Sequence, residues 1–146
     1  MLIRKMTIDD YDEVYSIWIS CKGMGLNSLD DSKDGINKFL NRNPDTCFTA
    51  TEENKIVGCI LAGNDGRRGY VYHTAVSPDY RQKGIGTKLT EKVIEALKEI
   101  GISKAALLVF ANNENGNQFW NKIGFTERND LIYRNKTIKE SDRIDT

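Results

Sequence analysis

The stretch VSPDYRQKGIGTKLTEKVIEAL, residues 76–97, passes from the end of a β-branched strand through a turn into an amphipathic helix. The turn has the spacing R-x-x-G-x-G, with Arg81 three residues before Gly84 and Gly86 two residues further on. From Ile85 onward, apolar residues recur at intervals of four or fewer, which is typical of a helix with one buried face. The turn therefore meets a helix N-terminus, where unpaired N–H groups and the positive end of the helix dipole converge.

A helix N-terminus of this kind can bind a phosphate. Glycines let the backbone approach an anion closely and allow a positive φ, while Arg81, Lys83 and Lys88 add positive charge. A Rossmann fingerprint would need a third glycine at Leu89, and a P-loop would need G-K-[ST] after four variable residues, so neither nucleotide motif fits. The alternative is a tight strand-to-helix turn with solvated cations, which R-x-x-G-x-G alone does not exclude.

The composition favours a single domain without an overall charge. With 146 residues, the chain is long enough for one domain with a substantial core but short for two. It has 21 Lys and Arg against 21 Asp and Glu, so no bulk field would attract nucleic acid or an acidic membrane. We therefore expect no nucleic-acid partner and no membrane partner, and a homodimer stays open.

The cysteines and the N-terminus favour a cytoplasmic location. Cys21, Cys47 and Cys59 are odd in number and lack C-x-x-C spacing, which fits reduced thiols better than a disulfide framework or a zinc site. The N-terminal MLIRKMTIDD carries acids where a signal peptide needs an apolar run, and AALLVFA, residues 105–111, is too short to cross a bilayer. We expect no metal site.

Periodicity predicts an α/β (α+β) chain with a mixed, mostly antiparallel sheet in the order β-α-α-β-β-β-α-β-α-β-β. A strand, a crossover helix and a strand over residues 69–111 imply a parallel pair. Residues 1–138 would form one domain and residues 139–146 a tail. The predicted strands are 2–6, 46–53, 55–63, 69–77, 104–111, 125–128 and 131–138, and the predicted helices are 8–19, capped by Thr7 and Asp10, 30–42, 85–100 and 113–124.

A second segment, NNENGNQFWNKIGF at residues 112–125, follows the later strand of that pair and would run as a helix beside the first. Together the two segments resemble the GNAT superfamily of N-acetyltransferases, whose order of strands and helices also agrees from residue 2 to residue 138. The family's acetyl-CoA motif [Q/R]-x-x-G-x-[G/A] is matched by Arg81, Gly84 and Gly86. Its pattern N-x-x-[small]-x-x-[F/L]-Y-x-[K]-x-G-F is matched by Asn113, Gly116, Phe119, Lys122, Gly124 and Phe125.

The resemblance implies a GNAT-type sheet in which the parallel fourth and fifth strands splay apart to admit the pantetheine arm of acetyl-CoA, the cosubstrate. It implies that Val76 offers this arm backbone hydrogen bonds, that Asn113 binds it from the other side, and that the N–H groups of residues 82–87 hold the pyrophosphate. The cofactor-binding residues so implied are Val76, Arg81, Gln82, Lys83, Gly84, Ile85, Gly86, Thr87, Asn113 and Trp120.

The reaction that the resemblance implies is direct attack of a neutral primary amine on the thioester, with the oxyanion stabilised by a backbone N–H near the end of YHTAV, residues 72–76. No acyl-enzyme is implied, and none of the cysteines is read as a nucleophile. Trp120 stands where the family often has an acid tyrosine, and indole can only donate its N–H, so Trp120 binds sulfur or packs. A glutamate that some members carry on the fifth strand is absent.

His73, the sole histidine, is the first candidate for the base that deprotonates the amine, because histidine titrates near neutral pH. Strict alternation would place it on the face of Ala75, with Tyr72 and Val76 on the opposite face. A structural role for His73 is the alternative. Tyr72 is the next candidate, as a proton relay, and Tyr133 is a weaker one.

The acceptor amine stays open: a small molecule, a peptide N-terminus or a protein lysine. The family lines this site with segments that correspond to residues 23–34 and 127–135, where Asp30, Asp31 and Asp34 could receive a cationic amine or merely support a helix start. Two other functions also stay open. One is a CoA-binding sensor or pseudoenzyme on the same fold, and the other is an interaction domain without a cofactor.

Overall fold

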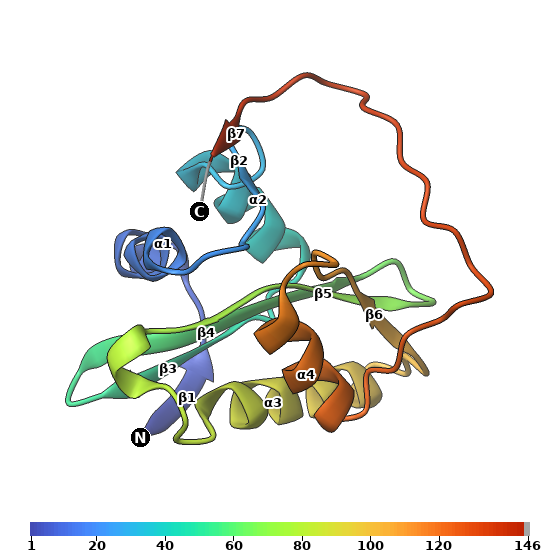
Figure 1. The fold of residues 1–146 in the computed structure, drawn as a ribbon. Coiled ribbons are helices and arrows are strands. Elements are labelled where there is room, and N and C mark those ends of the chain that lie inside the picture. Colours follow the sequence, from blue (N-terminus) through green and yellow to red (C-terminus); the bar gives the residue numbers. More distant parts are fainter. Residues whose placement is uncertain (145–146) are drawn as a thin grey trace.

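Five strands in the order β1-β3-β4-β5-β6 form the central sheet of the computed structural model, which describes residues 1–144 (Figure 1). Neighbouring strands are antiparallel except β5 and β6, which are parallel. The mixed, mainly antiparallel sheet and its parallel pair are thereby confirmed. The strands are β1 (Leu2–Lys5), β3 (Phe48–Glu52), β4 (Lys55–Asn64), β5 (Gly69–Val76) and β6 (Ala105–Leu107).

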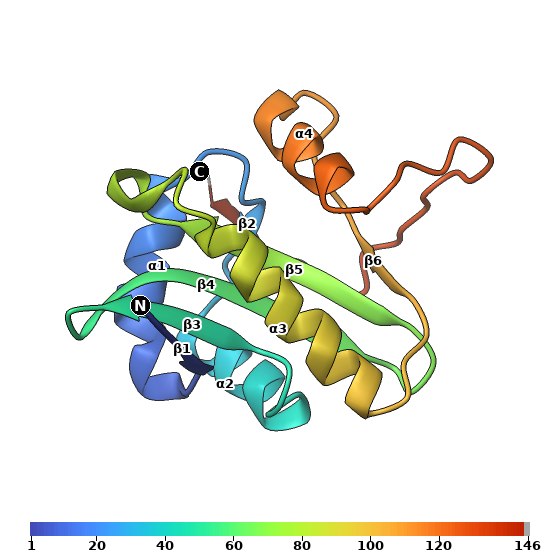
Figure 2. The same ribbon diagram turned by 90° about the horizontal axis from the view of Figure 1, so that it is seen from below.

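Helices cover both faces of this sheet (Figure 2). Helices α1 and α2 lie on one face, α3 lies along the other, and α4 stands beside the end of β6. Short 3-10 turns precede α1 and follow β5. The helical elements are η1 (Ile8–Asp10), α1 (Tyr11–Ser20), α2 (Lys33–Arg42), η2 (Pro78–Tyr80), α3 (Ile85–Glu99) and α4 (Glu114–Lys122).

The core has two halves, one on each face of the sheet, because successive side chains of a strand point to opposite faces. On β4, Cys59 belongs to the cluster that includes Trp18 of α1, while Ile60 belongs to the cluster that includes Leu89 of α3. Trp18 is fully buried. The sheet is thus apolar on both sides, and each helix is held by its buried stripe.

The helix ends follow local side-chain chemistry. Asp10 accepts a hydrogen bond from the Thr7 N–H at 2.9 Å and two from the Arg4 guanidinium, so the predicted cap is confirmed, although a 3-10 turn precedes α1. Helix α2 begins at Lys33, where the Ser32 hydroxyl accepts the N–H of the third helical residue. Among the acids before this helix, none supplies its cap.

The two closing strands expected at residues 125–128 and 131–138 do not form. This segment follows a wide arc away from the sheet, and its Ile132 side chain is 79% exposed (Figure 1). Strands need a partner with free backbone groups, and the strand at the outer edge, β6, is only three residues long. Instead, β7 (Arg143–Ile144) pairs antiparallel with the unexpected β2 (Leu26–Asn27). The boundary at residue 138 stays a prediction, and tail residues 145 and 146 lie outside the described residues.

Replacement of Leu89 by alanine should lower the free energy of unfolding by about 2–5 kcal/mol, because Leu89 is fully buried between α3 and β4. Ile94→Ala on the same helix is the matched control, since Ile94 is 42% exposed and should cost less than about 1 kcal/mol. Urea unfolding measures both values. Equal losses for the two variants would contradict the placement of α3.

Candidate functional site

The turn before α3 is built from two left-handed residues. Gln82 has φ +62° and Gly84, the N-cap of α3, has φ +78°. The first hydrogen bond of the helix runs from the Lys88 N–H to the Gly84 oxygen at 3.1 Å. The N–H groups of residues 85–87 therefore have no acceptor within the helix, and they point out of its N-terminus. This arrangement can receive an anion, as the sequence predicted.

The second glycine of the motif, Gly86, is explained by close packing between two helices and not by its backbone conformation. Gly86 does not have a positive φ, but a Cβ at this position would lie 3.2 Å from the Phe119 ring. The start of α3 therefore approaches α4 closely at Gly86, and a larger residue would push the two helices apart. Ile85 between the glycines is 3% exposed, so its side chain serves the core and only its N–H is available.

The parallel strands part before this turn. Their pairing stops at Val71 and Leu107, whereas β5 continues to Val76 and β6 diverges toward α4 (Figure 2). The Ser77 N–H donates to the Val57 oxygen at 2.8 Å, so the neighbouring pair of Gly58 and Val76 is of the non-hydrogen-bonded kind. The N–H and C=O of Val76 consequently point away from β4, toward the side that β6 has left.

The cations of the turn do not surround the free N–H groups. Arg81 folds back, with its Nε 3.3 Å from the Val76 oxygen and its Nη2 3.3 Å from the Cys21 sulfur. The Lys83 ammonium lies over the Tyr80 ring, 5.1 Å from its centroid. The structure thus brings Arg81 to the strand end, and the anion site as it stands consists of backbone groups.

Two residues at α4 that were predicted to bind the cofactor, Asn113 and Trp120, also make contacts with other residues of this region. Asn113 caps the helix, because its side-chain oxygen accepts the Gly116 N–H at 3.0 Å. A Cβ at Gly116 would lie 2.6 Å from the Asn113 amide nitrogen, so a side chain there would displace the Asn113 amide from its present position. Trp120 packs edge-on against the rings of Phe119 and Phe125, with centroids 4.9 and 5.2 Å away.

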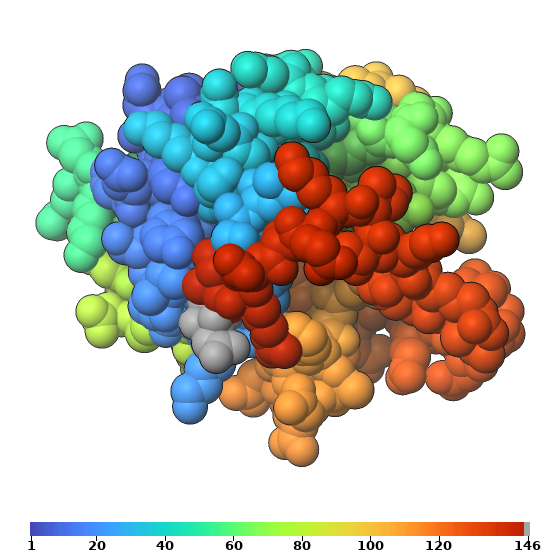
Figure 3. Space-filling view, turned by 90° about the horizontal axis from the view of Figure 1, so that it is seen from above, coloured from blue at the N-terminus to red at the C-terminus, as the bar shows by residue number. Residues whose placement is uncertain are grey.

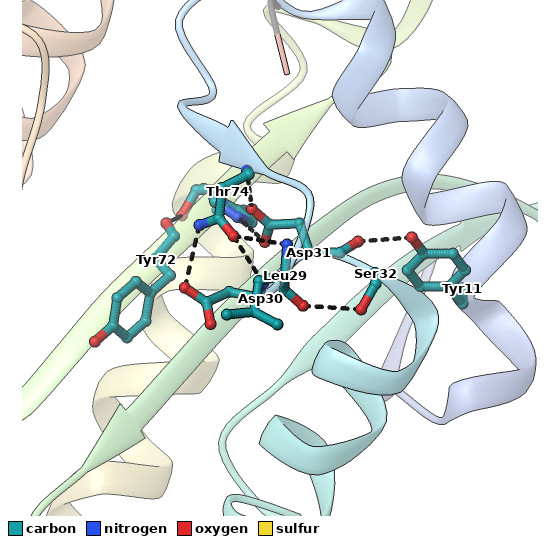
Figure 4. Close-up of polar contacts among 9 residues, drawn as sticks. Tyr11, Leu29, Asp30, Asp31, Ser32, Tyr72 and Thr74 are labelled. Carbon is teal, nitrogen blue, oxygen red and sulfur yellow. Dashed lines mark hydrogen bonds and ion pairs between the residues drawn. The ribbon is translucent and has the colours of Figure 1, made fainter. Parts of the chain in front are cut away.

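The first candidate for the base is paired with a carboxylate. His73 Nε2 lies 2.6 Å from Oδ1 of Asp31, and both side chains are largely buried, at 14% and 5% exposure. The other oxygen of Asp31 accepts the Asn27 N–H at 2.8 Å. The edge of the Trp18 indole packs on the imidazole, with ring centroids 4.9 Å apart. Figure 4 shows Asp31 at the centre of these polar contacts, with Tyr72 pointing away from it.

Strict alternation along β5 was the wrong prediction for Tyr72. Ile60 is opposite Thr74 but Ala62 is opposite Val71, so three steps on β5 match two on β4. The extra residue turns Tyr72 toward the face that α1 and α2 cover. There its ring packs edge-on against the ring of Phe39 of α2, with the ring centroids 5.6 Å apart. His73 contacts α1 on the same face. The register shift thereby brings the two candidate catalytic residues to one face of the sheet.

Tyr72 lies at the outer part of this face and is 54% exposed. Partial desolvation raises the pKa of its phenol, and the neighbouring Tyr70, Tyr133 and Asp30 raise it further. Tyr133 belongs to the C-terminal segment, which passes over this face between the α1–α2 region and α4 (Figure 3). Segments 23–34 and 127–135, which the resemblance assigns to the acceptor site, therefore both contribute residues near Tyr72.

The remaining groups lie apart from this constellation. Cys47 and Cys59 are free buried thiols whose burial raises the pKa of each to about 12, so neither is a nucleophile at neutral pH.

Residues 1–144 contain no cluster of three metal-binding side chains and no helix long and apolar enough to span a membrane. A groove of about 600 Å³ runs between α3 and residues 123–125, and Thr87 is the one predicted cofactor residue in its lining.

Comparison with known proteins agrees with this fold. Residues 11–125 match the model of the acetyltransferase (GNAT) family, and the chain belongs to that family. The acetyltransferase SG1711 of Sodalis glossinidius is 31% identical over 140 residues, which are 96% of this chain and 97% of the relative.

Solved structures share the fold at low sequence identity. The PaiA N-acetyltransferase of Thermoplasma acidophilum, solved in complex with coenzyme A, superposes with a TM-score of 0.77 at 19% identity, covering 97% of this chain and 95% of the other. Ard1 of Thermoplasma volcanium superposes with a TM-score of 0.75 at 22% identity, covering 86% and 82%.

The sequence did not indicate that Asp31 and His73 are partners. Asp31 stood with Asp30 and Asp34 as one of three acids at a helix start, and nothing in the spacing separated it from them. The pair is 42 residues apart in the chain and meets only because the α1–α2 segment lies on β5. One distinguishing feature is burial, since Asp31 is 4% exposed while both other acids are exposed.

Proposed function

We propose that this protein is an acetyl-CoA-dependent N-acetyltransferase that moves an acetyl group to a primary amine. The observation that carries the proposal is the turn of residues 81–84. It presents free N–H groups at a helix N-terminus, beside a strand end whose backbone groups have lost their neighbouring strand. A pyrophosphate and an extended amide-containing arm are the ligand groups that match these two features.

Acetyl-CoA would bind along this path without a metal. Its pyrophosphate would accept hydrogen bonds from the N–H groups of residues 82–87, and its pantetheine arm would pair with the backbone of Val76. The Arg81 side chain occupies the Val76 oxygen in this structure, so it would move to the anion when the cofactor enters. Asn113 retains its amide N–H groups for the arm. The coenzyme A complex of the Thermoplasma acidophilum neighbour supports this choice of cosubstrate.

His73 would act as the base through Nδ1, because Nε2 is held by Asp31. An alkylamine is mostly protonated at neutral pH and must lose a proton before it can attack the thioester. Its nitrogen then bonds to the carbonyl carbon, the C–S bond breaks, and a second amine proton leaves as the amide forms. Tyr72 lies on the same face and is the candidate relay for this proton to water.

The leaving group needs no acid from Trp120. Its indole packs between two phenylalanine rings and can only donate an N–H, so it would hold the sulfur or support the cofactor by packing. A thiol with a pKa of about 8.5 leaves tolerably well as a thiolate, which then takes a proton from water. Neither of the thiols Cys47 and Cys59 is ionised enough to form an acyl-enzyme, which supports direct transfer.

The acceptor would approach over Tyr70 and Tyr72, beside the exposed carboxylate of Asp30. Aromatic faces and one carboxylate suit a cationic amine, whether on a small molecule, a peptide or a protein. The three free cysteines favour a cytoplasmic site for the reaction. A homodimer remains compatible with this proposal.

A CoA-binding sensor or pseudoenzyme is the second candidate, favoured by the tryptophan at position 120. Measurement of amine-dependent turnover distinguishes an N-acetyltransferase from a sensor or pseudoenzyme. The protein should be incubated with acetyl-CoA and a panel of amines, namely spermidine, kanamycin and a lysine-containing peptide. At least one of these amines should make the release of free thiol faster than it is without an amine. Isothermal titration with acetyl-CoA should show binding in either case. Binding without amine-dependent thiol release on an extended panel would favour the sensor, and absence of binding would leave an interaction domain.

Gly84→Val should weaken acetyl-CoA binding by more than about tenfold, because the valine side chain would stand before the N–H groups that hold the pyrophosphate. A Cβ at Gly84 meets nothing within 4 Å, so the fold should survive, with strain of about 1–2 kcal/mol from the left-handed backbone. Isothermal titration measures the affinity.

Gly66→Val is the matched control for this backbone strain. Gly66 also has a positive φ, +86°, and open space at Cβ, but it lies in the hairpin between β4 and β5. This variant should lose similar stability and keep wild-type affinity. Wild-type affinity in a folded Gly84→Val protein would refute the assignment of the turn.

His73→Gln should lower kcat by about 10² or more at pH 7 and leave acetyl-CoA affinity nearly unchanged, because the base acts on the amine and not on the cofactor. Glutamine is chosen because its amide can still donate to Asp31, whereas alanine would strand a buried carboxylate. Steady-state rates and titration give the two values.

Higher pH should partly restore the rate of His73→Gln, because more of the amine is then already neutral. His73→Ala should show the same kinetic loss with an added loss of stability. Wild-type turnover of the glutamine variant at pH 7 would assign His73 a structural role and leave a water relay past Tyr72 as the base.

A further inference from the structure

Asp31 is buried and fully engaged. One carboxylate oxygen lies 2.6 Å from His73 Nε2 and the other accepts the Asn27 N–H at 2.8 Å. Its backbone is fixed as well, since the Tyr11 hydroxyl donates to the Asp31 oxygen at 2.6 Å. The carboxylate therefore has a fixed position and no free oxygen for a substrate.

The two other roles for an acid at this place do not apply to Asp31. It does not cap α2, because the Ser32 hydroxyl fills that role. It does not receive a cationic amine from solvent, because its side chain is only 5% exposed and both oxygens are already bonded. Its neighbour Asp30 is exposed, and its Oδ2 accepts a hydrogen bond from the Asn27 side-chain amide at 3.1 Å, so only its Oδ1 would be left to meet an amine.

The contact determines which ring nitrogen carries the proton. An ionised carboxylate can only accept hydrogen bonds, so Nε2 must be the protonated nitrogen of neutral His73. Nδ1 is then the nitrogen with a lone pair. The Trp18 edge against the imidazole fixes the ring plane. Ring orientation and tautomer are thus both determined by residues outside β5.

We infer that Asp31 is a positioning residue for the acetyl transfer: it holds His73 in the Nε2–H tautomer, leaves Nδ1 to take the amine proton, and stabilises the imidazolium that results. The inference rests on the proposed function, because it assumes that His73 is the base. A carboxylate behind a catalytic imidazole is a known means of fixing both tautomer and orientation, and loss of the correct tautomer is costly.

Asp31→Asn is the informative variant because an amide has only one oxygen. The Asn27 N–H can only donate, so the amide oxygen should turn to it, and the amide NH₂ should then face His73 Nε2. Nε2 must become the acceptor, and the proton moves to Nδ1. The variant should keep nearly the same volume and contacts while it reverses the tautomer.

The sole histidine of the chain makes this reversal directly observable. A two-bond ¹H–¹⁵N correlation spectrum at alkaline pH distinguishes the two tautomers of the neutral ring. Wild type should show Nε2–H and Asp31→Asn should show Nδ1–H. This readout needs neither cofactor nor acceptor. An Nδ1–H ring in wild type would overturn the inference, whatever the enzyme does.

The kinetic test uses acetyl-CoA together with the amine of the panel that gives the fastest release of thiol. Asp31→Asn should lower kcat by about 10²-fold or more, as His73→Gln does, and the double variant should be no slower than either single one. The KM for acetyl-CoA should change by less than about threefold. A purely structural role would instead lower stability without matching the loss caused by His73→Gln.

Asp10→Asn is the matched control for removal of a buried carboxylate. Asp10 is 7% exposed and bonded to Arg4 and to the Thr7 N–H, so its loss should lower stability but leave kcat and the His73 tautomer unchanged. The inference is wrong if Asp31→Asn reverses the tautomer and keeps wild-type kcat while His73→Gln is slow. If His73→Gln is also as fast as wild type, the proposed base is wrong instead.

Discussion

The early end of the parallel pairing between β5 and β6 is the constraint on which the site depends. The ladder stops at Val71 and Leu107, so the rest of β5 has no neighbouring strand on that side. Unpaired backbone groups are costly when they are buried, and the proposed cosubstrate would supply the missing partner along this edge. The same parting leaves room at the N-terminus of α3, where three further N–H groups are free.

A second constraint acts on the other side of β5. One extra residue in the strand turns both Tyr72 and His73 toward α1 and α2, which a regular strand could not do with adjacent side chains. The backbone edge proposed for the cofactor and the side chains proposed for proton transfer thus come from one strand. The α1–α2 segment then supplies Asp31, so the face proposed for the acceptor and the position of the proposed base are coupled.

The motif residues combine packing with binding. Gly84 permits a left-handed N-cap, Gly86 permits the close approach of Phe119, and Gly116 makes room for the Asn113 cap. A pattern that predicts a cofactor site therefore also describes how α3 and α4 come together. Arg81 is the exception, because its contacts with Val76 and Cys21 hold it at the strand end.

The sequence by itself determined the features that depend on neighbours in the chain. The cap by Thr7 and Asp10, the apolar stripes of the helices and the turn before α3 are local, so periodicity and spacing predict them. The tertiary structure alone decided the rest. Residues 131–138 have a strand-like composition but no partner edge, the register shift depends on the ladder with β4, and Asp31 meets His73 across 42 residues. Such contacts depend on how elements pack, which local sequence does not encode.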